Sequence, residues 1–220
     1  MTLRRRKTGL IVVVSGPSGV GKSTLCRAML SDLEGLTLSV SCTTRKPRPG
    51  ERDGVDYYFL DEAQFRDMIA RDEFIEWAQV YDHLYGTPWK AVIQAHEAET
   101  DVLLDIDAQG ARQIMARVKE AVFVFVTPPS LEALRTRLVA RASDPPEEIE
   151  RRLQHASEEI ANFHTYHYLV RNEDLVQATK ELEAIIIAER LKTSRLDKRW
   201  LVEQGLLVKT TVSCPSRSGL

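Results

Sequence analysis

Runs of apolar residues alternate along this chain with segments in which apolar residues return every third or fourth position. Such runs lie at residues 10–14, 102–107 and 121–126, the second of them ending in carboxylates, and they are typical of parallel strands buried on both faces. Leu25, Cys26 and Met29, which follow the first run, have the spacing of an amphipathic helix. Alternating strands and helices indicate an α/β fold with a mostly parallel sheet.

Shorter elements complete the pattern. Asp61 and Gln64 have the spacing of a capping box, and Thr87 is expected to cap a helix whose first residue is Pro88. Residues after 192 show no comparable alternation, and we treat 193–220 as an appendage. Strands are expected at 36–40, 55–60 and 168–171, and a further strand begins at 74–77 and continues to about 87. Helices are expected at 61–71, 88–96, 149–163 and 175–191, and another begins at Ser130.

The first apolar run leads into a glycine-rich segment that reads G-x-x-x-x-G-K-S, the phosphate-binding P-loop pattern. Its glycines let backbone N–H groups turn toward a phosphate chain, and the following helix adds a partial positive charge. We expect Lys22 to reach the β- and γ-phosphates of ATP and the Ser23 hydroxyl to ligate Mg²⁺. The expected ATP-binding residues of this loop are Gly16, Pro17, Ser18, Gly19, Val20, Gly21, Lys22, Ser23 and Thr24.

Asp105 ends an apolar strand that follows the P-loop unit. Ligands of parallel sheets bind at the carboxyl ends of the strands, and an acidic residue there commonly holds the water shell of Mg²⁺. A strand that ends in Asp is also common without any function. Together with the P-loop, Asp105 is expected to serve the metal through water.

A basic, proline-containing segment at residues 41–51 carries Arg45 and Arg48. Two guanidinium groups on a restricted backbone suit a second phosphate group, and Tyr57 and Tyr85 offer hydroxyl groups to the same phosphate. The alternative is a solvated basic loop, with both tyrosines serving in packing.

Glu76 lies between Ile75 and Trp77 on an expected strand. Its two oxygens match the N1–H and N2–H₂ donors of guanine, whereas adenine would leave the carboxylate unpaired; such discrimination can reach about 10⁴. The alternative is a surface glutamate on an alternating strand.

Arg137, Arg141 and Arg152 flank a break at residues 144–146, where a hinged flap could bring positive charge onto a transferring phosphoryl group. Each arginine could equally belong to a solvated helix face. His164 and His167 have a spacing seen in metal sites, but no other group of ligands accompanies them, and we expect no metal there.

Composition narrows the class of protein. The 220 residues are 43% hydrophobic and 28% charged, with a net charge of −2, which argues against bulk nucleic-acid binding. Cys26, Cys42 and Cys214 are too far apart in sequence to suggest a disulfide framework or a zinc site, so a cytoplasmic location is expected. Residues 1–8 form a basic tail, and the apolar run after it is too short to cross a membrane.

These motifs together resemble the guanylate kinase family. The resemblance covers about residues 9–191 and rests on GPSGVGKST at 16–24, SCTTRKPRPGE at 41–51, GVDYYF at 54–59, EFIEWA at 73–78 and YGT at 85–87. LDIDAQG at 104–110, PPS at 128–130 and RN at 171–172 continue it. The resemblance implies a three-layer P-loop core with a mostly parallel sheet (9–40, 98–135 and 159–192), an inserted GMP-binding lobe (41–97) and a small helical lid (136–158).

The resemblance also implies roles for individual residues. Asn172 would line the adenine site of ATP. The residues that would read guanine are Ser41, Glu76, Thr87 and Asp107, and those that would hold the GMP phosphate are Arg45, Arg48, Tyr57 and Tyr85. The residues that would act on the transferring group are Lys22, Arg45, Arg137, Arg141 and Arg152, with Ser23 and Asp105 serving Mg²⁺.

The expected activity is Mg²⁺-dependent phosphoryl transfer from ATP to GMP, and to dGMP, by a monomer or small homo-oligomer that binds neither nucleic acid nor membrane. A kinase of the same fold acting on another acceptor, such as a phosphorylated sugar, is one alternative, and Glu76 with the two arginines argues against it. A scaffold module is a second, against which the intact P-loop argues. A P-loop motor or GTPase is a third, for which a second phosphate clamp would have no purpose.

Overall fold

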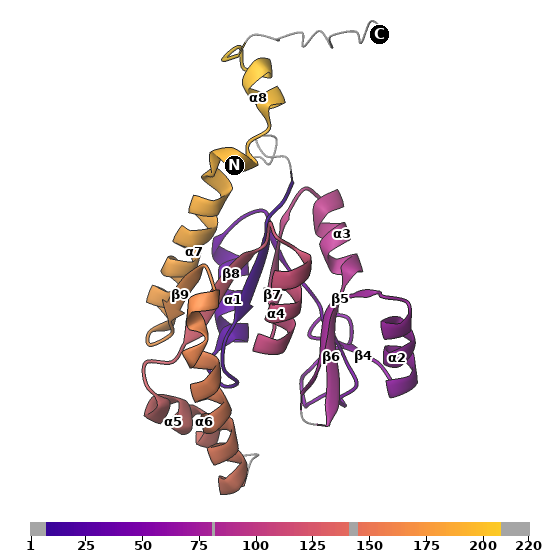
Figure 1. Ribbon diagram of the computed structural model, residues 1–220, viewed down its shortest axis with the longest axis vertical. Coiled ribbons are helices and arrows are strands. Elements are labelled where there is room, and N and C mark those ends of the chain that lie inside the picture. Colours follow the sequence, from indigo (N-terminus) through magenta and orange to yellow (C-terminus); the bar gives the residue numbers. More distant parts are fainter. Residues whose placement is uncertain (1–7, 81, 141–144, 208–220) are drawn as a thin grey trace, which may run out of the picture.

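The computed structural model describes residues 8–80, 82–140 and 145–207 and contains two β-sheets (Figure 1). The larger sheet has five strands in the order β2-β7-β1-β8-β9, and every pairing in it is parallel. The α/β fold with a mostly parallel central sheet is therefore confirmed. Its strands are β1 (Ile11–Ser15), β2 (Leu36–Leu38), β7 (Asp101–Asp105), β8 (Val122–Thr127) and β9 (Tyr168–Arg171).

Helices cover both faces of this sheet and make a three-layer core. Val12 and Val14 of β1 pack on the side of α1 (Lys22–Asp32) and α7 (Leu175–Leu191). Val13 packs on the other side, with α3 (Trp89–Glu97) and α4 (Ala108–Arg117). Burial on both faces explains why the strand sequences are apolar without alternation.

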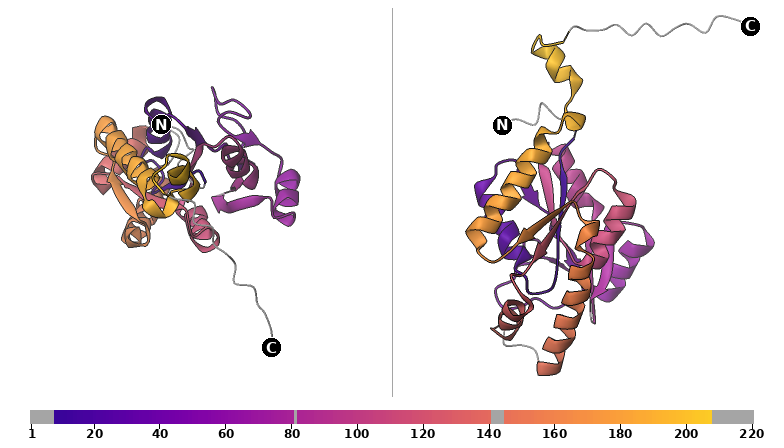
Figure 2. Two further views of the ribbon diagram at one scale, coloured as in Figure 1. Left: turned by 90° about the horizontal axis from the view of Figure 1, so that it is seen from above. Right: turned by 60° about the vertical axis from the view of Figure 1, so that its left-hand side comes forward.

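A second sheet of four strands lies to one side of the parallel sheet, together with α2 (Glu62–Ala70) (Figure 2). Its order is β4-β3-β6-β5. Phe65 of α2 stacks on Phe74 with ring centroids 4.5 Å apart and anchors the helix to the sheet. The strands are β3 (Cys42–Thr43), β4 (Tyr58–Phe59), β5 (Phe74–Val80) and β6 (His83–Pro88).

Two helices, α5 (Leu131–Ala140) and α6 (Pro146–Ala161), pack together around Leu134, Leu138 and Leu153. They lie at the opposite end of the molecule from α8 (Lys198–Glu203), the short helix of the carboxyl-terminal segment (Figure 1). Short 3₁₀ helices occur at Phe163–Thr165 and Thr193–Arg195. Within the described ranges no helix is long and apolar enough to cross a membrane.

Several local predictions are confirmed. Asp61 and Gln64 form the expected capping box of α2, and the Ser130 hydroxyl accepts a hydrogen bond from the first turn of α5. The bounds of β9 and α7 agree with the sequence pattern, because a polar residue follows each element, Asn172 after β9 and Lys192 after α7.

Other local predictions are wrong. Thr87 does not cap α3, because β6 continues through Pro88 and the Thr87 hydroxyl bonds to Glu76 instead. The expected single strand from residue 74 is an antiparallel hairpin of β5 and β6; the two residues between them include neither Gly nor Pro, so no turn signal was visible. The helix expected at 149–163 ends at Ala161, and Phe163, which lies beyond its end, is 48% exposed.

A buried ion pair holds α7 against the amino-terminal edge of the parallel sheet. Asp101 is fully buried and accepts hydrogen bonds from the Leu10 backbone N–H at 2.6 Å and from Arg190 Nε at 2.7 Å. Arg190 Nη2 also donates to the Glu34 carbonyl at 3.0 Å. One carboxylate therefore links β1, β7 and α7.

Replacement of Arg190 by Met is expected to lower the free energy of unfolding by about 3 kcal/mol, because the buried Asp101 carboxylate would lose its ion pair with Arg190. Urea denaturation followed by circular dichroism measures this loss. The control is Arg66→Met, whose pair with Glu62 is exposed at 63% and 65% and is expected to contribute less than about 1 kcal/mol. Equal losses in the two variants would contradict the assigned role of Arg190.

Candidate functional site

The P-loop (residues 16–24) joins the end of β1 to the start of α1. Gly16, Gly19 and Gly21 have φ values of 144°, 87° and 99°, which side chains disfavour. Gly21 is the N-cap of α1, and no side chain in the described part of the protein caps this helix. The backbone N–H groups of its first turn are therefore available to an anion.

The Val20 carbonyl is held from two directions. It accepts hydrogen bonds from Asn172 Nδ2 at 2.8 Å and from Arg137 Nη1 at 3.0 Å, while Arg137 Nη2 donates to the Asn172 carbonyl at 2.8 Å. Lys22 Nζ donates to the carbonyls of Gly16 at 2.6 Å and Pro17 at 3.2 Å. The Lys22 side chain therefore lies against the backbone of the P-loop.

Ser23 and Asp105 meet as their positions in the sequence predicted. Pairing of β1 with β7 sets Asp105 beside Val14, and the Ser23 hydroxyl donates to Asp105 Oδ2 at 2.5 Å. Oxygen donors suit Mg²⁺, which commonly keeps several waters and takes only one or two protein ligands. The pair fits that requirement, although the described residues contain no cluster of three or more His, Cys, Asp or Glu that could hold a metal by itself.

A cavity of about 540 Å³ extends from the P-loop to the second sheet, with α6 along one side. A nucleotide-sized molecule fits a space of this size. The predicted site residues that line it are Gly16, Ser18, Gly19, Gly21, Lys22, Ser23, Thr24, Ser41, Arg48, Tyr57, Glu76, Tyr85, Asp105, Asp107 and Arg152.

A chain of polar side chains supports Glu76 at the second-sheet end of the cavity. Glu76 is 4% exposed, and its Oε1 accepts a hydrogen bond from the Thr87 hydroxyl at 2.6 Å. Because that hydroxyl has one proton to give, the Ser41 hydroxyl, 3.2 Å away, donates to Thr87. Burial raises the pKa of Glu76 to about 7; the Asp107 carboxylate adds to this effect and the Thr87 hydrogen bond opposes it.

The two arginines of the basic segment behave differently. Arg48 lines the cavity. Arg45 does not; its guanidinium forms a two-pronged ion pair with Glu51, with both N–O distances 2.9 Å, over the ring of Tyr57. The Arg45 hydrogen bonds lower the pKa of Glu51. The Tyr57 and Tyr85 rings meet edge to face, 6.1 Å between centroids.

The structure does not bring every predicted residue to the cavity. Thr87 lies behind Glu76 as its hydrogen-bond donor, and Asn172 and Arg137 lie behind the P-loop. Pro17 and Val20 are loop residues that do not line the cavity. Arg141 lies outside the described residues.

Sequence reasoning missed part of the lining. Arg151, His155 and Glu159 also face the cavity from α6, and burial raises the pKa of Glu159. Their spacing, together with the predicted Arg152, is that of one helix face. The helical periodicity could have identified them once Arg152 was placed at the site.

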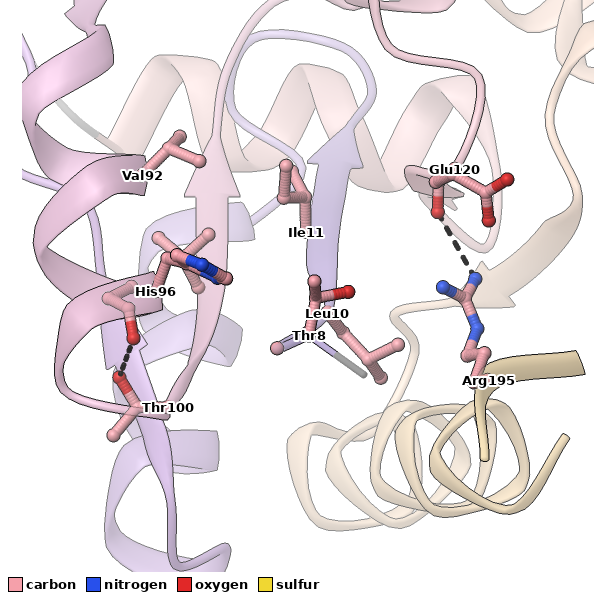
Figure 3. Close-up of a pocket in the computed structure, with 11 residues that line it drawn as sticks. Thr8, Leu10, Ile11, Val92, His96, Thr100, Glu120 and Arg195 are labelled. Atoms are coloured by element: carbon pink, nitrogen blue, oxygen red, sulfur yellow. Dashed lines mark hydrogen bonds between the residues drawn. The ribbon is translucent and has the colours of Figure 1, made fainter. Parts of the chain in front are cut away.

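A smaller cavity of about 190 Å³ lies at the other end of the parallel sheet (Figure 3). Its walls are largely apolar, with Ile11 and Val92 on two sides. Arg195 lines it but already donates to the Glu120 carbonyl at 3.1 Å and to Glu189 at 3.2 Å. The described residues that line this cavity do not include the glycine-rich loop that precedes α1.

Comparison with known proteins gives a consistent result. A family model described as guanylate kinase matches residues 8–189. The guanylate kinase of Carboxydothermus hydrogenoformans is 51% identical over 199 residues, which cover 90% of this chain and 98% of that protein. The one from Clostridioides difficile is 50% identical over 189 residues, covering 86% and 92%.

A solved structure agrees with these relatives. The crystal structure of guanylate kinase from Anaplasma phagocytophilum matches with a TM-score of 0.75 at 33% identity, and the match covers 93% of this chain and 99% of that one. Because the family model and these relatives extend over most of the sequence, the chain belongs to the guanylate kinase family.

Proposed function

We propose that this chain transfers the γ-phosphoryl group of ATP to GMP, and to dGMP, in a Mg²⁺-dependent reaction that yields ADP and GDP. One observation carries the proposal: a single cavity is lined at one end by the P-loop and at the other by the buried carboxylate of Glu76. That distribution of donors and acceptors matches two nucleotides placed phosphate to phosphate.

Glu76 reads the base in this proposal. Its ionised carboxylate accepts hydrogen bonds from guanine N1–H and N2–H₂, and the Thr87 and Ser41 hydroxyls orient it. Adenine would leave a buried carboxylate without donors, which is a strongly unfavourable arrangement. Asp107 lies near enough to Glu76 to affect its charge, and we assign it to the same base site.

Arg48, Tyr57 and Tyr85 hold the GMP phosphate from the cavity wall. Arg45 joins them by exchanging part of its contact with Glu51 for the phosphate. Glu51 also accepts the Arg48 backbone N–H at 2.7 Å. The same carboxylate thus holds the segment that presents both arginines.

Transfer requires in-line positioning and charge neutralisation more than covalent work by the protein. A phosphate oxygen of GMP attacks the γ-phosphorus while the bond to the oxygen bridging to the β-phosphate breaks, and ADP leaves with that electron pair. The acceptor oxygen is already anionic, so no general base is needed. Mg²⁺, when bound near Ser23 and Asp105, would neutralise charge on the β- and γ-phosphates.

Lys22 and the arginines supply the remaining positive charge. Lys22 swings from the Gly16 and Pro17 carbonyls to the phosphates, and Arg152 approaches from α6. Arg137 keeps the P-loop in shape through Val20. We assign residues 41–97 to a GMP lobe and 136–158 to a lid, whose closure over the core would exclude water from the reacting phosphates.

Purified protein with ATP and Mg²⁺ is expected to form ADP rapidly with GMP or dGMP and slowly with AMP, CMP or UMP, as measured in a coupled ADP assay. Lys22→Ala is expected to lower kcat/KM by at least about 10²-fold, because charge stabilisation of the transferring group is lost. Lys119→Ala serves as the control, since Lys119 is exposed, follows the end of α4 and donates a hydrogen bond to the Met115 carbonyl. Absence of nucleotide-stimulated ADP formation by the unmodified protein would refute the proposed function.

GMP binding is expected to strengthen by about tenfold between pH 6 and pH 8, because a carboxyl group with a pKa of about 7 ionises over this range. Isothermal titration calorimetry in two buffers of different ionisation enthalpy measures both the affinity and the proton released. Glu76→Gln is expected to bind GMP more weakly and to lose this part of the pH dependence. A pH profile of the same steepness in the variant would show that another group, such as the GMP phosphate, is responsible.

The same carboxyl group links pH to folding. The pKa of Glu76 is raised above the ordinary value of 4.5 in the folded protein. The contribution of this carboxyl group to the free energy of unfolding is therefore largest below pH 4.5. The contribution is lost as the pH rises toward about 7.

Asp105→Asn is expected to raise the Mg²⁺ concentration for half-maximal velocity by about tenfold or more, since an amide holds the metal's water shell less strongly than a carboxylate. Titration of MgCl₂ at fixed ATP and GMP measures this shift. Direct GMP binding without ATP is the control and should be unaffected. An unchanged Mg²⁺ requirement would exclude Asp105 from the metal site.

A further inference from the structure

Gly110 occupies the first turn of α4, where Asp107 is the N-cap and accepts the Gly110 N–H at 2.8 Å. It is the only glycine inside a helix in the described ranges. Glycine weakens helices relative to alanine, and Gly110 is not among the residues with positive φ. Helix formation therefore gives no reason for glycine at this position.

The space around Gly110 does give a reason. A Cβ atom built there would lie 2.3 Å from Glu76 Oε2, 2.9 Å from Glu76 Cδ and 3.3 Å from Glu76 Cγ. All three nearest atoms belong to one side chain, which comes from β5 of the second sheet. The carboxylate of Glu76 thus lies directly against the α4 backbone, in space that any side chain would occupy.

The other oxygen of the same carboxylate fixes its position. Glu76 Oε1 is bonded to Thr87 at 2.6 Å, and the side chain is almost fully buried. A methyl group at position 110 would push Oε2 away, and the carboxylate could yield only by rotating or by giving up the Thr87 hydrogen bond. The backbone of α4 would not need to move, because the group in the way is a side chain.

We propose that Gly110 is a positioning residue for base recognition: the absence of a side chain there lets the Glu76 carboxylate adopt the orientation that guanine requires. The proposal rests on the proposed function, in that GMP is the acceptor. It assigns guanine selectivity jointly to a glutamate of the second sheet and to a glycine of the parallel core.

Kinetic constants of Gly110→Ala test this role. The KM for GMP is expected to rise by about tenfold or more while the KM for ATP changes less than twofold, since the P-loop is untouched. Ala116→Gly is the matched control: it makes the opposite exchange at an exposed position of the same helix. It should leave both KM values within twofold of the unmodified protein.

A double-mutant cycle separates action through Glu76 from a general effect on the fold. In a Glu76→Ala background the carboxylate is gone, so Gly110→Ala should change the KM for GMP less than twofold. It should also raise the melting temperature by about 2 °C through better helix propensity. An equal rise in KM in both backgrounds, or no rise with Glu76 present, would overturn the proposal.

Failure of the proposed function would be visible separately, as absence of GMP-dependent turnover in the unmodified protein. In that event the placement of the carboxylate is tested by ¹³C NMR titration of the glutamate carboxyl groups, with the Glu76 signal identified by its loss in Glu76→Gln. Gly110→Ala is expected to move its titration midpoint further above the ordinary glutamate value, because displacement of the carboxylate from Thr87 removes a hydrogen bond that lowers the Glu76 pKa. An unchanged midpoint would show that Gly110 does not control the carboxylate.

Discussion

The parallel pairing of β1 with β7 on one side and β8 on the other is the constraint on which the rest of the site depends. It brings the loop after β1 and the carboxylate at the end of β7 to the same edge of the sheet. Ser23 and Asp105 meet for that reason, and α4 begins three residues after Asp105, where its first turn reaches Glu76. A one-residue slip of β7 would turn Asp105 to the opposite face.

Buried carboxylates in this protein have two kinds of surroundings. Asp101 and Glu189 lie beside cations that come from the end of α7 or just after it, and they hold the end of the molecule remote from the cavity. Glu76 instead receives a hydroxyl hydrogen bond and faces a second carboxylate. The first arrangement favours the folded state, whereas the second weakens it at neutral pH and leaves a strong acceptor ready for a ligand.

The sequence allowed the α/β class, the P-loop, the Ser23–Asp105 pair and the bounds of β9 and α7 to be predicted, because each depends on local periodicity or on a motif of fixed spacing. It did not reveal the hairpin of β5 and β6, which lacks a glycine or proline signal. It also predicted Thr87 as a helix cap, since local propensity favours that role. In the structure the Thr87 hydroxyl instead donates to the buried Glu76 carboxylate of the neighbouring strand.

Two features could not be predicted because they depend on packing between distant segments. One is the set of α6 residues that line the cavity, and the other is the closeness of Gly110 to Glu76. Assigned roles in catalysis and binding, including those of Arg45, Arg137 and Asn172, stay predictions.

The Val20 carbonyl, held by Asn172 from beyond β9 and by Arg137 from α5, has a consequence for the thermodynamics of nucleotide capture. A glycine-rich loop is ordinarily costly in conformational entropy to order. Here two side chains from distant segments set its shape before any phosphate arrives. Less of the interaction energy with the triphosphate is then consumed in ordering the backbone, and more of it appears as affinity and as alignment of the reacting phosphorus.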